Sequence, residues 1–150
     1  LSMLPQNMYA KGSYFKTFKK TPYKSLIYPV PEQDSLGLHL TYDLDGNVKF
    51  GPDIEYIDDI DYEVKENIKN KFFESISTLC PEIELDDLHA DYSGIRPKIC
   101  FDGNVYDDFL ITNKLVKNNQ NIINLMGIES PGFTSSLAIA RYVMRNYLTS

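Results

Sequence analysis

The sequence predicts an α+β fold built on a mostly antiparallel, mixed sheet. Apolar and polar residues alternate over 36–44, and the Asp-Gly-Asn turn signal at 45–47 leads into a returning strand at 48–50. Apolar residues recur at helical spacing over 63–79 and again over 131–148. The order is strands, helix, strands, helix, with hairpin-like connections and no internal repeat, which is typical of this fold class.

Composition and charge limit the chain to about one globular domain and exclude several classes of protein. Its 150 residues are 43% hydrophobic and 24% charged, which suffices to bury a sizeable core. The net charge of −6 argues against a nucleic-acid surface, and the lysines within 16–24 are expected to form a solvated loop face. No apolar run reaches the ~18 residues of a membrane span, and no segment has the pattern of a signal peptide.

Two cysteines, Cys80 and Cys100, are too few for a disulfide framework. Neither has a second Cys or a His at the spacing of metal ligands, so no metal site is predicted. We expect reduced thiols and a cytoplasmic protein.

The first half of the chain is expected to supply most of the sheet. Residues 14–18 predict a weak strand and turn, 25–30 a short strand stopped by prolines, and 54–60 an irregular segment. In the alternating strand, one face is expected to carry Leu36, Leu38, Leu40, Tyr42 and Leu44. The opposite face is expected to carry Gly37, His39, Thr41 and Asp43.

An amphipathic helix is predicted over 63–79, with Pro81 as its stop signal. Its apolar stripe is expected to pack in the core rather than to bind a partner. A strand interrupted at Gly94 is predicted over 88–99. Two short apolar strands, 108–112 and 122–126, are expected to be joined by a turn at 118–121.

Residues 122–140, IINLMGIESPGFTSSLAIA, give the strongest chemical signal. A buried strand is expected to run through a loop with Gly127 and Gly132 into the second helix. Ser130 and Thr134 are N-cap candidates, and Pro131 suits a first helical turn. Free N–H groups and the helix dipole favour an electronegative ligand there. An ordinary strand-to-helix turn is the alternative.

Two side chains outside that loop are also candidates. Arg96 lies in SGIRPK (93–98), where a fixed guanidinium suits bidentate binding of a carboxylate; a surface salt bridge is the alternative. His39 is on the polar face of its strand and suits proton acceptance if that face lines a ligand cavity. A structural histidine of the sheet is the alternative.

Seven segments, in this order and at roughly this spacing, resemble one family. They are KGSYFK (11–16), LIYPVP (26–31), LGLHLT (36–41), FGPD (50–53), SGIRPK (93–98), DFLI (108–111) and NLMGIESPGFTSSLAIA (124–140). Together they are similar to the C-terminal part of the FAD-dependent L-2-hydroxyglutarate dehydrogenase/oxidase group, within the D-amino-acid-oxidase-like flavoenzymes. The resemblance extends from about Lys11 to Leu148.

The resemblance implies a division of the chain. Residues 1–100 are expected to form the substrate-domain sheet and helix, and 101–150 the C-terminal strands and helix that complete the FAD-binding domain. The sequence has no GxGxxG fingerprint, so the N-terminal dinucleotide-binding half is expected to be absent. A split gene, a degenerate remnant or an excised piece would each account for this. We therefore expect FAD in the complete enzyme, and a chain that is inactive and holds little FAD alone.

In the intact enzyme, the resemblance implies oxidation of a 2-hydroxy acid to a 2-oxo acid, with a hydride passing to the flavin. Arg96 is expected to anchor the substrate carboxylate, with Lys98 as a second contact. Tyr14 is expected to bind the substrate or line the pocket, with core packing as the alternative. His39 is the expected catalytic base, since it suits the proton of an alcohol.

The resemblance also implies cofactor contacts in the glycine loop. The expected contacts are Gly127, Ile128, Gly132, Phe133 and Thr134. Their N–H groups and the helix dipole would stabilise negative charge on the reduced ring. Glu129 is out of place beside an anionic flavin, so its side chain is expected to point to solvent or to a basic group.

Two other readings remain open. The first is a non-enzymatic remnant or subunit that associates without flavin and covers its apolar surface by self-association. If the gene is split, the partner would instead be a separate N-terminal FAD-binding chain. The second is the same fold acting on an amino acid, which Arg96 would serve equally. A base such as His39 favours a hydroxy acid, because a neutral amine needs no base.

Overall fold

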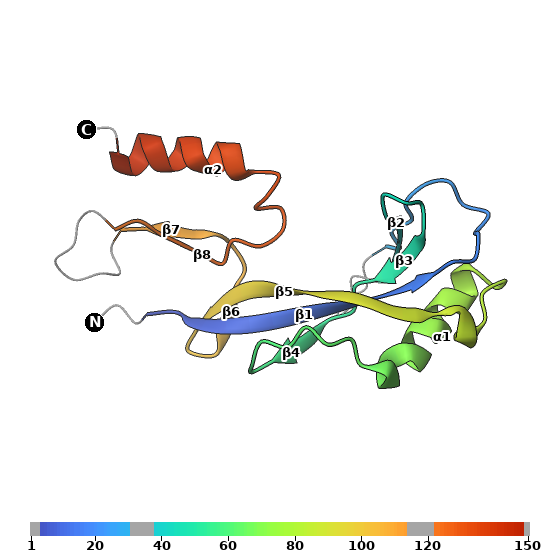
Figure 1. Cartoon of the computed structure of the whole chain (residues 1–150). Coiled ribbons are helices and arrows are strands. Elements are labelled where there is room, and N and C mark those ends of the chain that lie inside the picture. The colour runs from blue at the N-terminus through green and yellow to red at the C-terminus, as the bar shows by residue number, and fades with distance from the viewer. Residues whose placement is uncertain (1–3, 31–37, 114–121, 149–150) are drawn as a thin grey trace. The chain divides into compact units, whose positions relative to one another are not determined.

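The computed structural model describes residues 4–30, 38–113 and 122–148. The chain divides into two compact units, which we name the terminal unit (Leu1–Ala10 with Arg96–Ser150) and the central unit (Lys11–Ile95). Two long strands, β1 (Gln6–Thr17) and β5 (His89–Phe101), run through both of them (Figure 1). The predicted α+β class is confirmed.

The main sheet has six strands in the order β2-β3-β1-β5-β6, with β4 paired to β1. The shorter strands are β2 (His39–Tyr42), β3 (Val48–Gly51), β4 (Glu55–Ile57) and β6 (Asn104–Tyr106). A separate hairpin joins β7 (Leu110–Thr112) to β8 (Asn124–Met126). The pairs β1–β3, β2–β3, β5–β6 and β7–β8 are antiparallel, as the sequence predicts.

The β2–β3 hairpin and the helix α1 (Lys69–Leu79) enclose the core of the central unit. Leu40 pairs with Phe50, and Phe50 pairs with Phe15 on β1; all three are buried. The Phe15 ring lies 4.8 Å from that of Phe72 on α1, between ring centroids. Burial of each such side chain contributes about 1.5–3 kcal/mol. The predicted core role of the helix stripe is confirmed.

The hairpin turn forms at the predicted place, but the apolar face of the strand is shorter than expected. Asp43 Oδ1 accepts hydrogen bonds from the N–H groups of Asp45 (3.0 Å) and Asn47 (2.8 Å), which ends β2 at Tyr42. Leu44 therefore lies in the turn and is fully exposed. Leu36 and Gly37 lie outside the described residues.

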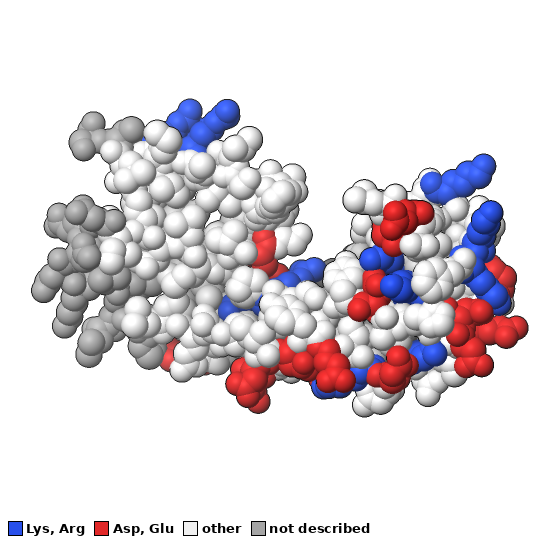
Figure 2. All heavy atoms as spheres, viewed as in Figure 1, with Lys and Arg blue, Asp and Glu red and all other residues white. Residues whose placement is uncertain are grey.

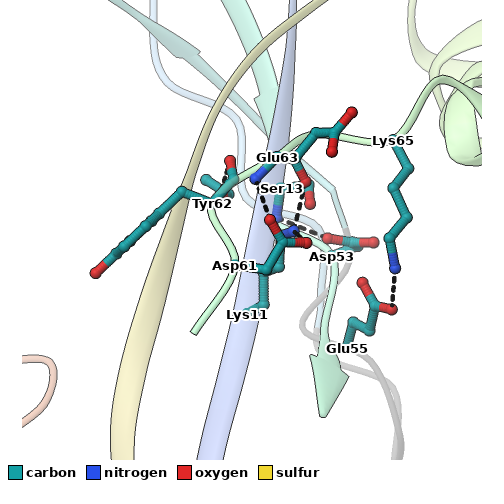
Figure 3. A network of polar contacts seen from close by, with 9 residues as sticks. Lys11, Ser13, Asp53, Glu55, Asp61, Tyr62, Glu63 and Lys65 are labelled. Carbon is teal, nitrogen blue, oxygen red and sulfur yellow. Dashed lines mark hydrogen bonds and ion pairs between the residues drawn. The ribbon is translucent and has the colours of Figure 1, made fainter. Parts of the chain in front are cut away.

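Strand β1 is much longer than the weak strand predicted at 14–18. The alternating apolar pattern of a strand is weak here because β1 buries polar side chains, including Lys11 and Ser13. Figure 3 shows how Lys11 is tolerated, because its Nζ contacts Asp61 Oδ2 at 3.1 Å and the Glu63 carbonyl. Beside it, the backbone N–H of Ser13 is donated to Asp53 Oδ1 at 2.7 Å. Buried polar groups of this kind are stable when they are hydrogen-bonded.

Three other boundaries in the central unit differ from expectation. The segment 25–30 forms only a bridge between Ile27 and Leu40, and β4 lies within the segment expected to be irregular. A 3₁₀ turn, Glu66–Ile68, precedes α1, so the helix begins at Lys69 rather than at 63. It ends before Pro81, as predicted.

Strand β5 passes through Gly94, which belongs to the central unit, without a break, contrary to prediction. The second helix, α2 (Ser136–Val143), is extended by a π-helical turn, Met144–Leu148, and begins later than predicted. Residues 130–135 form turns because Ser135, the N-cap, donates its N–H to the Pro131 carbonyl at 2.9 Å. The predicted caps Ser130 and Thr134, and the placement of Pro131 in the first helical turn, are therefore wrong. The predicted turn at 118–121 lies outside the described residues.

Candidate functional site

The predicted site residues fall into two groups, one in each unit, and each group is described by itself. His39 and Tyr14 belong to the central unit. Arg96, Lys98 and the loop 127–134 belong to the terminal unit.

The first group lies on what we call the polar face, the side of β2, β3 and β1 opposite α1. The register pairs His39 with Gly51, Thr41 with Lys49, and Lys49 with Lys16. Because alternate residues of a strand point to opposite sides, these residues lie opposite the buried Leu40 and Phe50. The predicted placement of His39 opposite the core leucine is confirmed.

Gly51 brings Tyr14 close to the strand position of His39. Its φ of +145° is readily adopted only by glycine, and a Cβ there would lie 2.7 Å from Tyr14 Cδ1. Tyr14 therefore packs over Gly51, which is the cross-strand partner of His39. The His39 ring also lies 4.1 Å from the ring of Tyr28, between centroids. The structure thus places both predicted residues on one part of the polar face.

Charged residues that sequence reasoning missed surround this pair. Asp91 on β5 contacts Lys16 Nζ at 3.0 Å and Lys49 Nζ at 2.7 Å, and its side chain is 11% exposed. Burial opposes ionisation of Asp91, but the hydrogen bonds from Lys49 and Lys16 hold its pKa below the ordinary value. The bond to Asp91 raises the pKa of Lys49.

Aromatic rings connect this ion cluster to Tyr14. Lys49 Nζ lies 4.8 Å from the centre of the Tyr92 ring, and Tyr92 stacks on Tyr14 at 4.5 Å with a 7° interplanar angle. Nothing in the local sequence joins these residues, because Lys49 and Tyr92 lie far apart along the chain. The only available signal was the presence of charged side chains inside otherwise apolar strands.

The second group is a three-residue ion cluster in the terminal unit, formed by Arg96, Lys98 and Glu129. Lys98 Nζ lies 2.8 Å from Glu129 Oε1, and one guanidinium nitrogen of Arg96 lies 3.3 Å from Glu129 Oε2. The side chains of Lys98 and Glu129 are each 16% exposed, whereas that of Arg96 is 40% exposed. Lys98 also contacts the exposed Asp107 at 3.4 Å.

This cluster bears on one expectation, the direction of the Glu129 side chain. The hydrogen bond to Glu129 raises the pKa of Lys98, so the ammonium is stabilised there. The expectation that Glu129 points to a basic group is confirmed, since it meets two. Arg96 makes a salt bridge, which was the alternative to carboxylate binding, but its partner Glu129 is mostly buried rather than at the surface.

The loop that carries Glu129 is held by internal turns. Gly127 has a φ of +64°, a left-handed conformation that suits glycine. Glu129 donates its N–H to the Gly127 carbonyl at 3.0 Å, and its own carbonyl accepts the Gly132 N–H at 2.5 Å. A Cβ on Gly132 would lie 2.6 Å from the Glu129 carbonyl oxygen, so glycine is required for this turn. The structure thus fixes the backbone at both ends of the loop.

The same loop was expected to contact FAD, and its residues differ in exposure. The N–H of Gly132 is used inside the loop and is not offered to a ligand. Phe133 (97% exposed) and Thr134 lie exposed just before α2, where the helix start favours negative charge. Contact between this loop and FAD stays a prediction.

Over the described residues, no group of three or more His, Cys, Asp or Glu side chains is arranged to hold a metal ion. In the same part of the chain, Cys80 and Cys100 are buried free thiols. Burial raises the pKa of the Cys80 thiol to about 11, so it is protonated at neutral pH.

A family model described as DAO, FAD dependent oxidoreductase, matches residues 1–145. The chain belongs to this family. The resemblance read from the seven segments is therefore confirmed, and FAD is the cofactor on which members of the DAO family depend. No helix within the described ranges is long and apolar enough to cross a membrane.

Two curated relatives and one solved structure illustrate the similarity. The chain is 41% identical to the mitochondrial L-2-hydroxyglutarate dehydrogenase of Arabidopsis thaliana, covering 97% of this chain and 32% of that protein. It is 27% identical to the L-2-hydroxyglutarate dehydrogenase of Indibacter alkaliphilus, covering 86% and 41%. The fold matches that of dithionite-reduced, FAD-bound L-alpha-glycerophosphate oxidase from Mycoplasma pneumoniae, with a TM-score of 0.74 at 21% identity, covering 97% and 38%.

The chain thus spans 32–41% of the length of these relatives. The plant relative is named as mitochondrial, so a cytoplasmic location stays a prediction. The division of functions at residue 100 also stays a prediction.

Proposed function

We propose that this chain is the C-terminal, substrate-side portion of an FAD-dependent enzyme that oxidises a 2-hydroxy acid, L-2-hydroxyglutarate or a close analogue, to the 2-oxo acid. The observation that carries the proposal is the 41% identity to an L-2-hydroxyglutarate dehydrogenase along 97% of the chain. The two groups of polar side chains described above supply the functions that such a reaction requires.

The polar face supplies the proton acceptor. Loss of hydride from C2 of a 2-hydroxy acid requires that the hydroxyl proton pass to a base. His39 is on the polar face, and an imidazole suits this transfer near neutral pH. Tyr14, which packs over the glycine paired with His39, is positioned to orient the substrate hydroxyl.

The terminal unit supplies the carboxylate anchor. The Arg96 guanidinium has five N–H donors in a planar fork, and only one of its nitrogens contacts Glu129 in the structure. It is also the most exposed member of its cluster, so its remaining donors suit a bidentate bond to the substrate carboxylate. Lys98, which is held by Glu129, is the second candidate contact.

FAD, when bound, supplies the hydride acceptor. The chain residues that would hold it are Gly127, Ile128, Gly132, Phe133 and Thr134, with Phe133 and Thr134 presenting the accessible side. The start of α2 would favour negative charge there. Because the sequence has no GxGxxG, the pyrophosphate would be bound by polypeptide outside these 150 residues, and the chain alone is expected to be inactive.

The surface of α2 supports association with such a polypeptide. Leu137 (76%) on α2, and Met144 (55%) and Leu148 (62%) on the π-helical turn that extends it, are apolar and exposed. Figure 2 shows few charges over α2, β7 and β8 on the face in view, whereas charges gather over the central unit. The same exposed apolar residues favour a second candidate, a non-enzymatic subunit that associates with its own copies.

Product analysis tests the proposal. The FAD-loaded assembly that contains this chain is incubated with L-2-hydroxyglutarate and a dye as electron acceptor, and with L-glutamate in parallel. We expect 2-oxo acid from the hydroxy acid and far less from the amino acid. If L-glutamate is turned over as fast as L-2-hydroxyglutarate or faster, the result favours amino-acid oxidation and contradicts the proposal. A colourless, self-associated protein that takes up no FAD with any partner would favour the second candidate.

A further inference from the structure

Glu129 places a carboxylate on the two cations that the proposed function assigns to the substrate. Each oxygen meets one cation, at 2.8 Å on Lys98 and 3.3 Å on Arg96. The cluster therefore already holds an anion of the same chemical class as the substrate's reactive end. The inference below rests on the proposed function, because it concerns how that carboxylate reaches Arg96.

The two contacts of Glu129 differ in strength. The pair with Lys98 is short, and both side chains are only 16% exposed, which is the setting in which charge-assisted hydrogen bonds are strong. The contact with Arg96 is longer, at 3.3 Å against 2.8 Å for the contact with Lys98, and the Arg96 side chain is 40% exposed. Arg96 is therefore the member from which Glu129 separates more easily, since exposed ion pairs are weak.

The backbone keeps Glu129 in place when that separation occurs. Its N–H is bonded to the Gly127 carbonyl and its carbonyl to the Gly132 N–H. The carboxylate can thus move away from Arg96 by side-chain rotation while Lys98 continues to hold it.

We propose that Glu129 is an internal carboxylate ligand of Arg96 that an incoming carboxylate must displace, and that Lys98 is a positioning residue that retains Glu129 during the exchange. A carboxylate that approached Arg96 with Glu129 still bound would meet a like charge at hydrogen-bond range, which is unfavourable. When the Glu129 carboxylate moves away from Arg96, this repulsion is removed at Arg96, while Glu129 stays bound to Lys98. Glu129 therefore lowers the affinity of the subsite and assists the release of a carboxylate product.

Carboxylate titrations of the chain test the exchange. Glutarate and L-2-hydroxyglutarate are added to the wild type and to Glu129→Gln, and the side-chain N–H signals of arginine are followed by NMR. We expect Glu129→Gln to bind about tenfold more tightly, since loss of one charged competitor corresponds to roughly that factor. Glu129→Ala should change affinity in the same direction. Asp102→Asn, an equal change of charge at the β5–β6 turn, should stay within about twofold of wild type.

A second pair of variants tests the role given to Lys98. Lys98→Met should weaken glutarate binding in the wild-type background, because Glu129 is then free to hold Arg96 alone. In the Glu129→Gln background it should have little further effect, since the two residues act through one another. A similar loss in both backgrounds overturns the positioning role and makes Lys98 a direct contact.

The outcomes separate this inference from the proposed function. Suppose that the wild type binds glutarate, and that Glu129→Gln and Glu129→Ala, both folded by circular dichroism, bind it with equal or lower affinity. This result overturns the inference and leaves Arg96 as the carboxylate anchor. Absence of binding by the wild type and by every Glu129 variant overturns both, because Arg96 is then no anchor.

Discussion

At the scale of single residues, the polar face joins a candidate base to a candidate substrate contact through one glycine. Gly51 has no Cβ, so the Tyr14 ring lies over the strand position paired with His39. A side chain there would collide with Tyr14 and with the Ser13 carbonyl, at 2.7 and 2.6 Å. The arrangement of the face therefore depends on a backbone position as much as on the side chains.

His39→Gln in the FAD-loaded assembly should keep flavin binding and slow flavin reduction by ~10²-fold or more, which is typical of a lost general base. Stopped-flow reduction, normalised to bound FAD, measures this rate. His89→Gln changes the other histidine and should reduce at a nearly normal rate. If His39 is only structural, its variant will lose stability and reduce normally per folded molecule.

Arg96→Ala should raise KM strongly and lower kcat/KM by ~10²–10³, because a charged hydrogen bond to the substrate is lost. Steady-state kinetics with L-2-hydroxyglutarate measure the change. Arg141→Ala, an exposed arginine of α2, is the matched control. A loss below about threefold would show that another residue holds the carboxylate.

Sequence reasoning reached these residues unequally. The side on which His39 lies follows from two-residue alternation, which needs no tertiary information. The contact of Glu129 with Lys98 joins residues 31 apart in sequence, and that with Arg96 joins residues 33 apart. Such pairs depend on how a loop packs against a strand, so the sequence predicted only that Glu129 would point to solvent or to a basic group.

At the scale of elements, Asp91 links β5 to the lysines of β1 and β3. Its carboxylate bridges Lys16 and Lys49 with little exposure to solvent. Ion pairs of this kind matter most through the cost of leaving one partner buried and unpaired. The polar face therefore depends on Asp91 for its geometry.

Asp91→Asn should destabilise the chain by about 1–3 kcal/mol near neutral pH, because two lysines lose a charged partner. The folded pKa of Asp91 is lower than the unfolded value of about 4, so its contribution is present above that value and is lost as pH falls through the folded pKa. Urea unfolding should thus show a large difference between variant and wild type at neutral pH and a smaller one near pH 3. A difference that does not depend on pH would contradict this account.

The elements were predictable where a regular apolar pattern decides them. The β2–β3 hairpin and the core role of α1 follow from alternation and from helical spacing. Strand β1 was largely missed because Lys11, Ser13 and Thr17 occupy buried positions, and the partners of Lys11 and Ser13 come from a segment more than 30 residues away. The start of α2 was placed too early because Pro131 lies in the turns of residues 130–135, which precede the helix, rather than in its first turn.

At the scale of the whole molecule, the chain belongs to the family of FAD-dependent oxidoreductases but its sequence has no dinucleotide fingerprint. It spans 32% of its plant relative, and α2 with its π-helical turn exposes apolar side chains. The sequence was sufficient for the family because seven short segments occur in order.

The chain alone should bind FAD weakly or not at all, because nothing in its sequence provides the glycine-rich turn that binds the pyrophosphate. Isothermal titration of the purified chain with FAD measures this directly. A dissociation constant that is micromolar or tighter would show that the loop 127–134 and α2 suffice to hold the cofactor.

Anaerobic reduction of the flavin tests the central claim most directly. The FAD-loaded assembly is mixed with L-2-hydroxyglutarate in the absence of oxygen, and the flavin absorbance bands are recorded. We predict that the bands bleach, that 2-oxo acid forms in a one-to-one ratio with reduced flavin, and that L-glutamate causes no comparable bleaching. A flavin that stays oxidised with the hydroxy acid, in an assembly that dithionite can reduce, would contradict the account.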